Sequence, residues 1–87
     1  SNLNEARITA SLLQRIYRLT APDFNPHKTV GVIVPYRNQI AMIRKEISRL
    51  GIPELMDISI DTVERYQGSE RDVIIYSIRL PYAIPVS

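Results

Sequence analysis

The chain has 87 residues, which leaves room for one small hydrophobic core. Its net charge is +2, nine of its eleven basic residues are arginine, and it contains one histidine and no cysteine. That composition excludes a disulfide framework and offers no cluster for a zinc centre, so we expect no bound metal. No apolar run approaches the roughly 20 residues that cross a bilayer, and we expect a cytoplasmic protein with no membrane partner.

The first half of the chain predicts a helix, a loop and a strand. Apolar side chains recur at helical spacing over residues 4–19, and the arginines fall mostly on other faces. The expected apolar stripe consists of Ile8, Leu12, Leu13, Ile16 and Leu19. Residues 20–28 contain two prolines and are predicted as a loop. Residues 30–34 are apolar without polar alternation, which is typical of a strand buried on both faces of a parallel sheet.

The second half predicts two further strands joined through helices. A helix follows Tyr36 and ends at Gly51, with Ile40, Ile43, Ile47 and Leu50 as its apolar stripe.

Residues 58–60 are a candidate short strand, after which Asp61 or Thr62 caps a single helical turn that runs to Gln67 and stops at Gly68. Residues 73–78 are a third apolar strand. Strands separated by helices favour parallel pairing through right-handed crossovers. We therefore predict the α/β class, as a three-layer α/β/α arrangement around a small parallel sheet.

Two segments resemble consecutive helicase motifs. The sequence VGVIVPYRNQ at residues 30–39 is similar to motif IV of superfamily 1B helicases, Upf-type helicases among them, and IDTVERYQGSERDVIIYS at residues 60–77 is similar to motif V. NLNEA at residues 2–6 also resembles the start of the helix that precedes motif IV in that family. The order and spacing of all three match, and the second motif is specific.

The resemblance implies a partial second RecA-like domain of a P-loop NTPase over residues 1–87, family-like over 1–79 and divergent over 80–87. Val34 stands where the family usually has threonine, and the sequence after Ser77 does not continue toward the arginine of motif VI. The phosphate loop and the acidic Mg-binding strand are expected in a first RecA-like domain that this sequence does not contain. ATP and Mg are therefore expected in the parent protein, with none bound to this chain, and the chain alone is expected to be inactive as an enzyme.

The resemblance assigns nucleotide contact to Gln67, Gly68 and Glu70. Without the motif, Glu70 would be interpreted as a surface partner of Arg71 or Arg65, a contact that contributes about 0–1 kcal/mol. Gly68 would be interpreted as a plain helix C-cap, and both interpretations of the glycine can hold together.

Nucleic-acid contact is predicted for Thr62, Arg65, Tyr36 and Gln39. Thr62 is expected at the N-terminal end of the short helix, where free N–H groups favour a phosphate, although capping alone explains it equally well. Tyr36 and Gln39 come after the carboxyl end of a strand, the edge at which α/β sheets bind ligands. Packing is the favoured role for Tyr36, and an exposed Arg65 needs no function.

These observations leave three hypotheses. The first is a fragment of an ATP-dependent DNA or RNA helicase that senses nucleotide and contacts single-strand phosphates through motif V. The second is a helicase-derived nucleic-acid or protein-binding module without ATPase activity, and the third is a non-functional truncated remnant. The expected partners are single-stranded DNA or RNA, the missing first RecA-like domain, and a second copy of the chain through exposed sheet edges.

Overall fold

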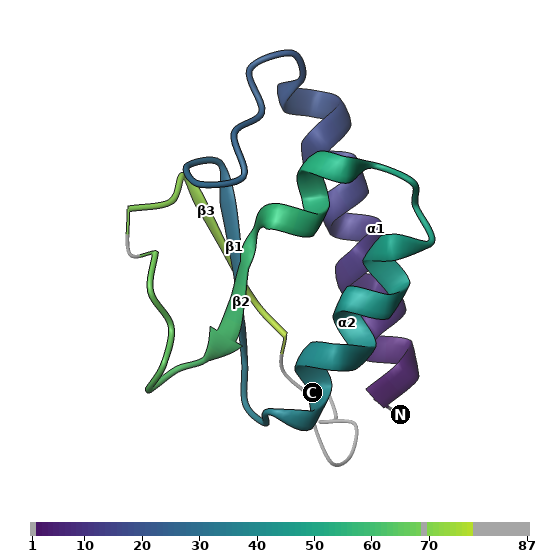
Figure 1. Ribbon diagram of the computed structural model, residues 1–87, viewed down its shortest axis with the longest axis vertical. Helices are drawn as coiled ribbons and strands as arrows, with labels where there is room; N and C mark the ends of the chain where they lie inside the picture. Colours follow the sequence, from purple (N-terminus) through teal and green to yellow (C-terminus); the bar gives the residue numbers. More distant parts are fainter. Residues whose placement is uncertain (1, 69, 78–87) are drawn as a thin grey trace, which may run out of the picture.

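The computed structural model describes residues 2–68 and 70–77. Its elements in chain order are α1 (Asn2–Thr20), β1 (Val30–Val34), α2 (Asn38–Ser48), the 3₁₀ helix η1 (Pro53–Asp57), β2 (Ser59–Thr62) and β3 (Val73–Tyr76). The three strands form a parallel sheet in the order β2-β1-β3, with α1 and α2 packed together beside it (Figure 1). The predicted α/β class and the parallel sheet are confirmed.

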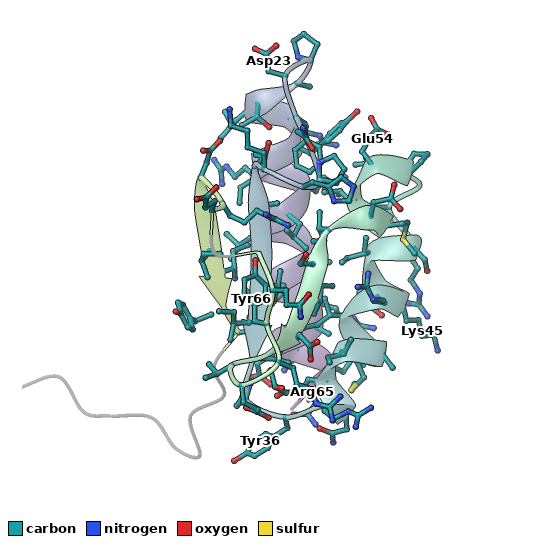
Figure 2. The ribbon with its side chains drawn as sticks, turned by 60° about the vertical axis from the view of Figure 1, so that its left-hand side comes forward. Asp23, Tyr36, Lys45, Glu54, Arg65 and Tyr66 are labelled. Atoms are coloured by element: carbon teal, nitrogen blue, oxygen red, sulfur yellow. The ribbon has the colours of Figure 1, made fainter. Side chains whose placement is uncertain are left out.

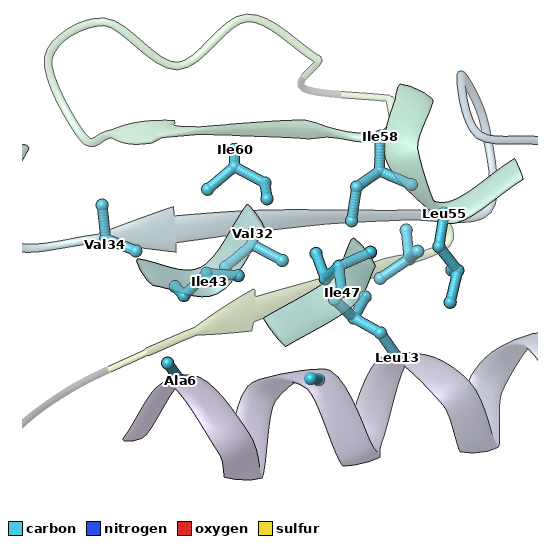
Figure 3. Packing of buried hydrophobic residues seen from close by; sticks show 11 residues of the cluster. Ala6, Leu13, Val32, Val34, Ile43, Ile47, Leu55, Ile58 and Ile60 are labelled. Atoms are coloured by element: carbon cyan, nitrogen blue, oxygen red, sulfur yellow. The ribbon is translucent and has the colours of Figure 1, made fainter. Parts of the chain in front are cut away.

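The central strand β1 supplies the middle of the core. In the registers of the two pairings, Val32 lies opposite Ile60 of β2 and Ile75 of β3. Val30, Val32 and Val34 are fully buried and belong to one cluster with Leu13, Ile43 and Ile47 from the helices (Figure 3). All five residues of β1 are buried, as a central strand of a parallel sheet requires. The prediction for residues 30–34 is confirmed at both ends.

Both described helices lie on one face of the sheet (Figure 1). A helical layer on the opposite face is not found among the described residues, because residues 63–68 and 70–72 lie over that face without forming a helix. Handedness explains the crossing. The connection from β1 to β2 runs one way across the sheet and the connection from β2 to β3 runs back over β1, so two right-handed crossovers must use opposite faces. The second layer is therefore helical and the third is a loop.

The buried face of α1 differs from the predicted stripe. Ala6, Thr9, Ala10 and Leu13 are buried, whereas Ile8, Leu12 and Leu19 are 60%, 44% and 78% exposed. Small side chains at Ala6 and Ala10 let α1 approach its neighbours closely, and larger residues at those positions would hold it away. The apolar periodicity predicted the helix correctly; of its stripe, Leu13 is buried and Ile16 packs against the core, but the buried face is rotated toward Ala6 and Ala10.

The helix boundaries have local causes. Glycine at position 51 has φ +69°, a conformation that favours glycine, and it lies three residues beyond Ser48, where α2 ends; the helix is therefore three residues shorter than predicted. The short helix η1 was not predicted; Pro53 at its start has the fixed φ that suits a first helical turn. The ladder continues one residue past β3, since the Ser77 N–H donates to the Ile33 carbonyl at 2.9 Å. Residue 78, included in the predicted strand, lies outside the described residues.

Polar contacts connect the helices to each other and to the sheet. Glu46, 8% exposed, forms ion pairs with Arg7 of α1 and with Arg49, each at 3.7 Å. The buried Thr9 hydroxyl donates to the Ser77 hydroxyl at 3.1 Å, which joins α1 to the end of β3. Charged and polar groups buried in this way are tolerated because they have partners.

The C-terminal end of α1 is joined to η1 by a phenol–carboxylate contact. The Tyr17 hydroxyl donates to Glu54 Oε2 at 2.6 Å, a charge-assisted hydrogen bond. This bond raises the pKa of Tyr17 and lowers the pKa of Glu54, since it favours the neutral phenol and the ionised carboxylate.

Candidate nucleic-acid and nucleotide site

The carboxyl ends of β1 and β2 bring together part of the predicted site. The strands are parallel and Val34 pairs with Thr62, so the segments that leave the two strands emerge at the same edge of the sheet. Tyr36, two residues beyond β1, is 67% exposed, and Arg65, three residues beyond β2, is exposed at the same end of the molecule (Figure 2). The fold thus places an exposed aromatic ring and an exposed guanidinium at one end of the sheet.

The helical turn predicted from residue 61 or 62 to Gln67 is found as one hydrogen-bonded turn after Thr62 and not as a helix, so the predicted N-terminal cap is wrong. Asp61 and Thr62 are the last residues of β2, and they lead into a single turn in which the N–H groups of Arg65 and Tyr66 both donate to the Thr62 carbonyl, at 3.1 and 2.8 Å. Asp61 does not cap a helix; its Oδ1 accepts the N–H of Thr62 at 2.8 Å. Parallel pairing with β1 over Ser59–Thr62 gives the backbone groups of Asp61 and Thr62 hydrogen-bond partners in the sheet, so they do not need the partners that a helix would provide.

Two predicted contact residues are buried. Thr62 is 2% exposed, and its hydroxyl has no hydrogen-bond partner among the described residues. Gln39 is 3% exposed, and its Oε1 accepts the N–H of Tyr36 at 3.0 Å. Gln39 therefore holds the strand-to-helix turn that presents Tyr36. Of the four predicted nucleic-acid contacts, Tyr36 and Arg65 are therefore exposed, and Thr62 and Gln39 are buried.

A polar groove of about 610 Å³ runs along the open edge of β2. It is lined by residues of α2, of β2 and of the segments just before and after β2: Arg44, Ile58, Ser59, Ile60, Asp61, Glu64, Arg65 and Gln67. The Arg44 guanidinium donates to the carbonyls of Met56 and Ile58 at 3.2 and 3.3 Å, which fixes it at the groove wall. The groove carries both charge signs, and its arginines are the groups in it that suit phosphate.

The predicted nucleotide residues lie on the loop over the outer face of the sheet. Gln67 and Glu70 are exposed, and Gly68 has φ +135°, a backbone conformation that residues with a side chain rarely adopt. The Arg71 guanidinium packs beside Gly68 and donates to the Ser59 hydroxyl of β2 at 3.2 Å. The glycine is thus required by the loop geometry. It is not a helix C-cap here, because the helix is absent.

Sequence reasoning missed the residues that attach this loop to the sheet. The Tyr66 hydroxyl lies directly over Gly31 of β1, and burial raises the pKa of this phenol while the nearby positive charge of Arg71 acts in the opposite direction. A glycine inside an otherwise β-branched strand was the available signal, since such a glycine often marks a close approach of another group.

Two kinds of feature were sought in the part of the chain that the structure describes, residues 2–68 and 70–77: a cluster of metal ligands and a membrane-spanning helix. No group of three or more His, Cys, Asp or Glu side chains in those ranges is placed to hold a metal ion. Neither α1 nor α2 is long and apolar enough to span a bilayer.

The sequence matches a family model described as an AAA domain over residues 1–79, and the chain belongs to that family. Its relatives include superfamily 1 helicases, which confirms the resemblance at the level of the family. No solved structure gives a significant match.

Three curated relatives are similar to this chain. It is 31% identical over 83 residues to Helicase sen1 of Schizosaccharomyces pombe and 40% identical over 79 residues to DNA polymerase alpha-associated DNA helicase A of Saccharomyces cerevisiae. It is 46% identical over 48 residues to the human RNA helicase Mov10l1. These alignments cover 94%, 90% and 55% of this chain but only 5%, 11% and 4% of the relatives. The chain is thus similar to a small segment of each helicase.

Proposed function

We propose that this chain forms the part of an ATP-dependent helicase that contacts single-stranded nucleic acid and senses nucleotide through one loop. The observation that carries the proposal is the course of residues 62–68 and 70–72. The segment begins at the carboxyl end of β2, close to the exposed Arg65. It continues over the outer face of the sheet and contains Gln67, Gly68 and Glu70. This stretch of chain therefore contains the three predicted nucleotide residues together with Thr62 and Arg65 of the predicted nucleic-acid contacts, whereas Tyr36 and Gln39 come from the β1–α2 junction.

Nucleic acid would meet the carboxyl-end surface of the sheet. Arg65 supplies a phosphate contact there and Tyr36 an exposed ring, while the β2 groove continues from Arg65 to Arg44. Thr62 would take part only after the turn opens, because its hydroxyl is buried. Binding through so few phosphates is weak and strongly reduced by salt. DNA and RNA are both compatible with contacts of this kind, and the relatives include a DNA helicase and an RNA helicase by name.

Nucleotide sensing would use the exposed Gln67 and Glu70 beside the backbone of Gly68. A glutamine amide both donates and accepts, and a carboxylate accepts from ribose hydroxyls. The phosphate loop, the Mg site and the other wall of the cleft would come from a first RecA-like domain. ATP, Mg and that domain are therefore partners of the proposed complete protein. A cytoplasmic location belongs to the same proposal.

The test is fluorescence anisotropy of a labelled oligothymidylate with the 87-residue chain at two salt concentrations. We expect weak binding whose log–log salt slope reports about −0.7 per neutralised phosphate. Arg65→Ala should make that slope shallower by about 0.7, since one contact is lost.

Arg18→Ala is the matched control. Arg18 is also exposed, but it lies in the last turn of α1 and not at the carboxyl end of the sheet. It should leave the slope unchanged. Equal effects of the two substitutions, or tight binding that ignores salt, would contradict the proposed site.

A further inference from the structure

Gly31 occupies an unusual place for a glycine. It is the second residue of the central strand β1, between Val30 and Val32, where it is buried and paired with Ser59 on one side and Ile74 on the other. Glycine inside a strand weakens it, because it provides no side chain to pack and loses more conformational entropy on folding. A strand that otherwise consists of valine and isoleucine therefore needs a reason for this residue.

The reason is visible on the outer face of the sheet. A Cβ added at Gly31 would overlap the hydroxyl of Tyr66 and would lie 2.8 Å from Cζ and 3.3 Å from Cε1 of the same ring. The overlap involves a ring, which cannot fold aside as the end of a flexible chain can. Tyr66 therefore occupies the space that any other residue at position 31 would fill.

The ring has a second bare neighbour in Gly68. A Cβ at that position would lie 3.0 Å from the Tyr66 hydroxyl and 2.9 Å from the Arg71 guanidinium. Arg71 in turn donates to Ser59 on β2. The phenol is thus enclosed by the strand backbone, the loop glycine and an arginine attached to the neighbouring strand.

We propose that Gly31 is a positioning residue. Because it has no side chain, the Tyr66 ring can pack directly on β1, and the packed ring holds residues 63–68, the 63–68 turn, against the sheet. The proposal rests on the proposed function, because Tyr66 lies in sequence between Arg65 and the Gln67–Gly68 pair. Fixing the ring fixes the backbone on both sides of it. Gly31 thereby sets the position of the phosphate contact and of the nucleotide contact without touching either ligand.

The principal test is Gly31→Ala in the 87-residue chain, with amide hydrogen exchange read by NMR. We expect faster exchange at Arg65 and Tyr66, whose N–H groups bond to the Thr62 carbonyl, and loss of the contact between residue 31 and the Tyr66 ring. The ladder amides of β1 should keep their protection. Unchanged exchange at the turn, with the ring still in contact, would overturn the proposal.

Gly51→Ala is the matched glycine control. Gly51 also has a special backbone conformation, with φ +69°, but a Cβ there meets nothing within 4 Å. This substitution should lower the melting temperature through backbone strain and leave exchange at Arg65 and Tyr66 at its wild-type rate relative to global opening.

A double-mutant cycle with Tyr66→Ala distinguishes loss of the Gly31–Tyr66 contact from a general effect of the substitution on β1. Once the ring is removed, Gly31→Ala should cause no further loss of turn protection, so the two changes are strongly non-additive. Additive losses would show that Gly31 acts independently of Tyr66. If Gly31→Ala does not fold, Tyr66→Ala alone decides: slow exchange at Arg65 in that variant would refute the positioning role.

Oligothymidylate binding tests whether the Gly31–Tyr66 contact matters for the proposed nucleic-acid contact. Gly31→Ala should make the salt slope shallower by about 0.7, the same loss as for Arg65→Ala, because a displaced turn no longer presents the guanidinium. An unchanged slope in a variant with a mobile turn would contradict the functional part of the inference. A wild-type chain that does not bind the oligonucleotide would refute the proposed function, and the exchange data would still decide whether Gly31 positions the turn.

Discussion

Replacing Leu13 with alanine tests how α1 is rotated on the core. Leu13 has no exposed surface and packs in the cluster between the two helices and the sheet. A buried leucine truncated to alanine loses its transfer free energy and leaves a cavity, which typically costs about 2–5 kcal/mol. In a domain of this size each kcal/mol lowers Tm by roughly 4–8 °C. Taking a cost of about 3 kcal/mol, we expect Tm to fall by roughly 12–24 °C.

Leu12→Ala is the control, one residue away in the same helix. Leu12 is 44% exposed, so its truncation should cost less than about 1 kcal/mol and lower Tm by a few degrees. Thermal unfolding monitored by circular dichroism measures both variants under the same conditions. Equal losses would refute the reasoning, because the apolar pattern of the sequence places both leucines on one stripe and only the structure separates them.

Four further predictions concern two buried or paired hydroxyl groups, ATP hydrolysis and self-association. Tyr17→Phe should destabilise the chain at neutral pH, and denaturant titrations should show the loss shrinking as the pH falls, since a carboxyl with a lowered pKa stabilises the fold only while ionised. Tyr66→Phe should raise stability by about 1 kcal/mol in the same assay, because the buried hydroxyl has no partner among the described residues. A phosphate-release assay should detect no ATP hydrolysis by the chain alone, since its sequence has no G-x-x-x-x-G-K-[ST] phosphate loop. Sedimentation should show concentration-dependent association through the edge of β3, which pairs with no strand among the described residues beyond β1 and exposes Val73 and Tyr76; a monomer at high concentration would contradict it.

The helices and strands were largely predictable because their signals are local. The unbroken apolar run of residues 30–34 predicted the buried central strand, and Gly51 predicted the end of α2 to within three residues. The rotation of α1 was not predictable from hydrophobicity alone. Close packing at Ala6 and Ala10 decides which side of that helix is buried, and that requirement depends on the neighbouring elements and not on the helix sequence.

The candidate site was predictable as a set of positions and less so as a geometry. The motif resemblance selected Arg65 and Tyr36, which are exposed at one end of the sheet, but also Gln39, which is buried and caps a turn. The segment 61–64 carries the local signature of a helix start, and pairing of β2 with β1 overrides it. Gly31 and Tyr66 lie far apart in sequence, on either side of α2, so no local pattern could reveal their contact.

Amide chemical-shift mapping with an oligothymidylate tests the central claim most directly, because exposed arginines also lie on α1, away from the carboxyl end of the sheet. We expect amide chemical-shift changes at Tyr36, at Arg65 and through the 63–68 turn. We expect little change along the exposed face of α1 that carries Arg7, Arg15 and Arg18. Shifts confined to that helix face, with the carboxyl end of the sheet unaffected, would contradict it. That result would identify α1 as the binding surface and would remove the loop from the proposed nucleic-acid contact.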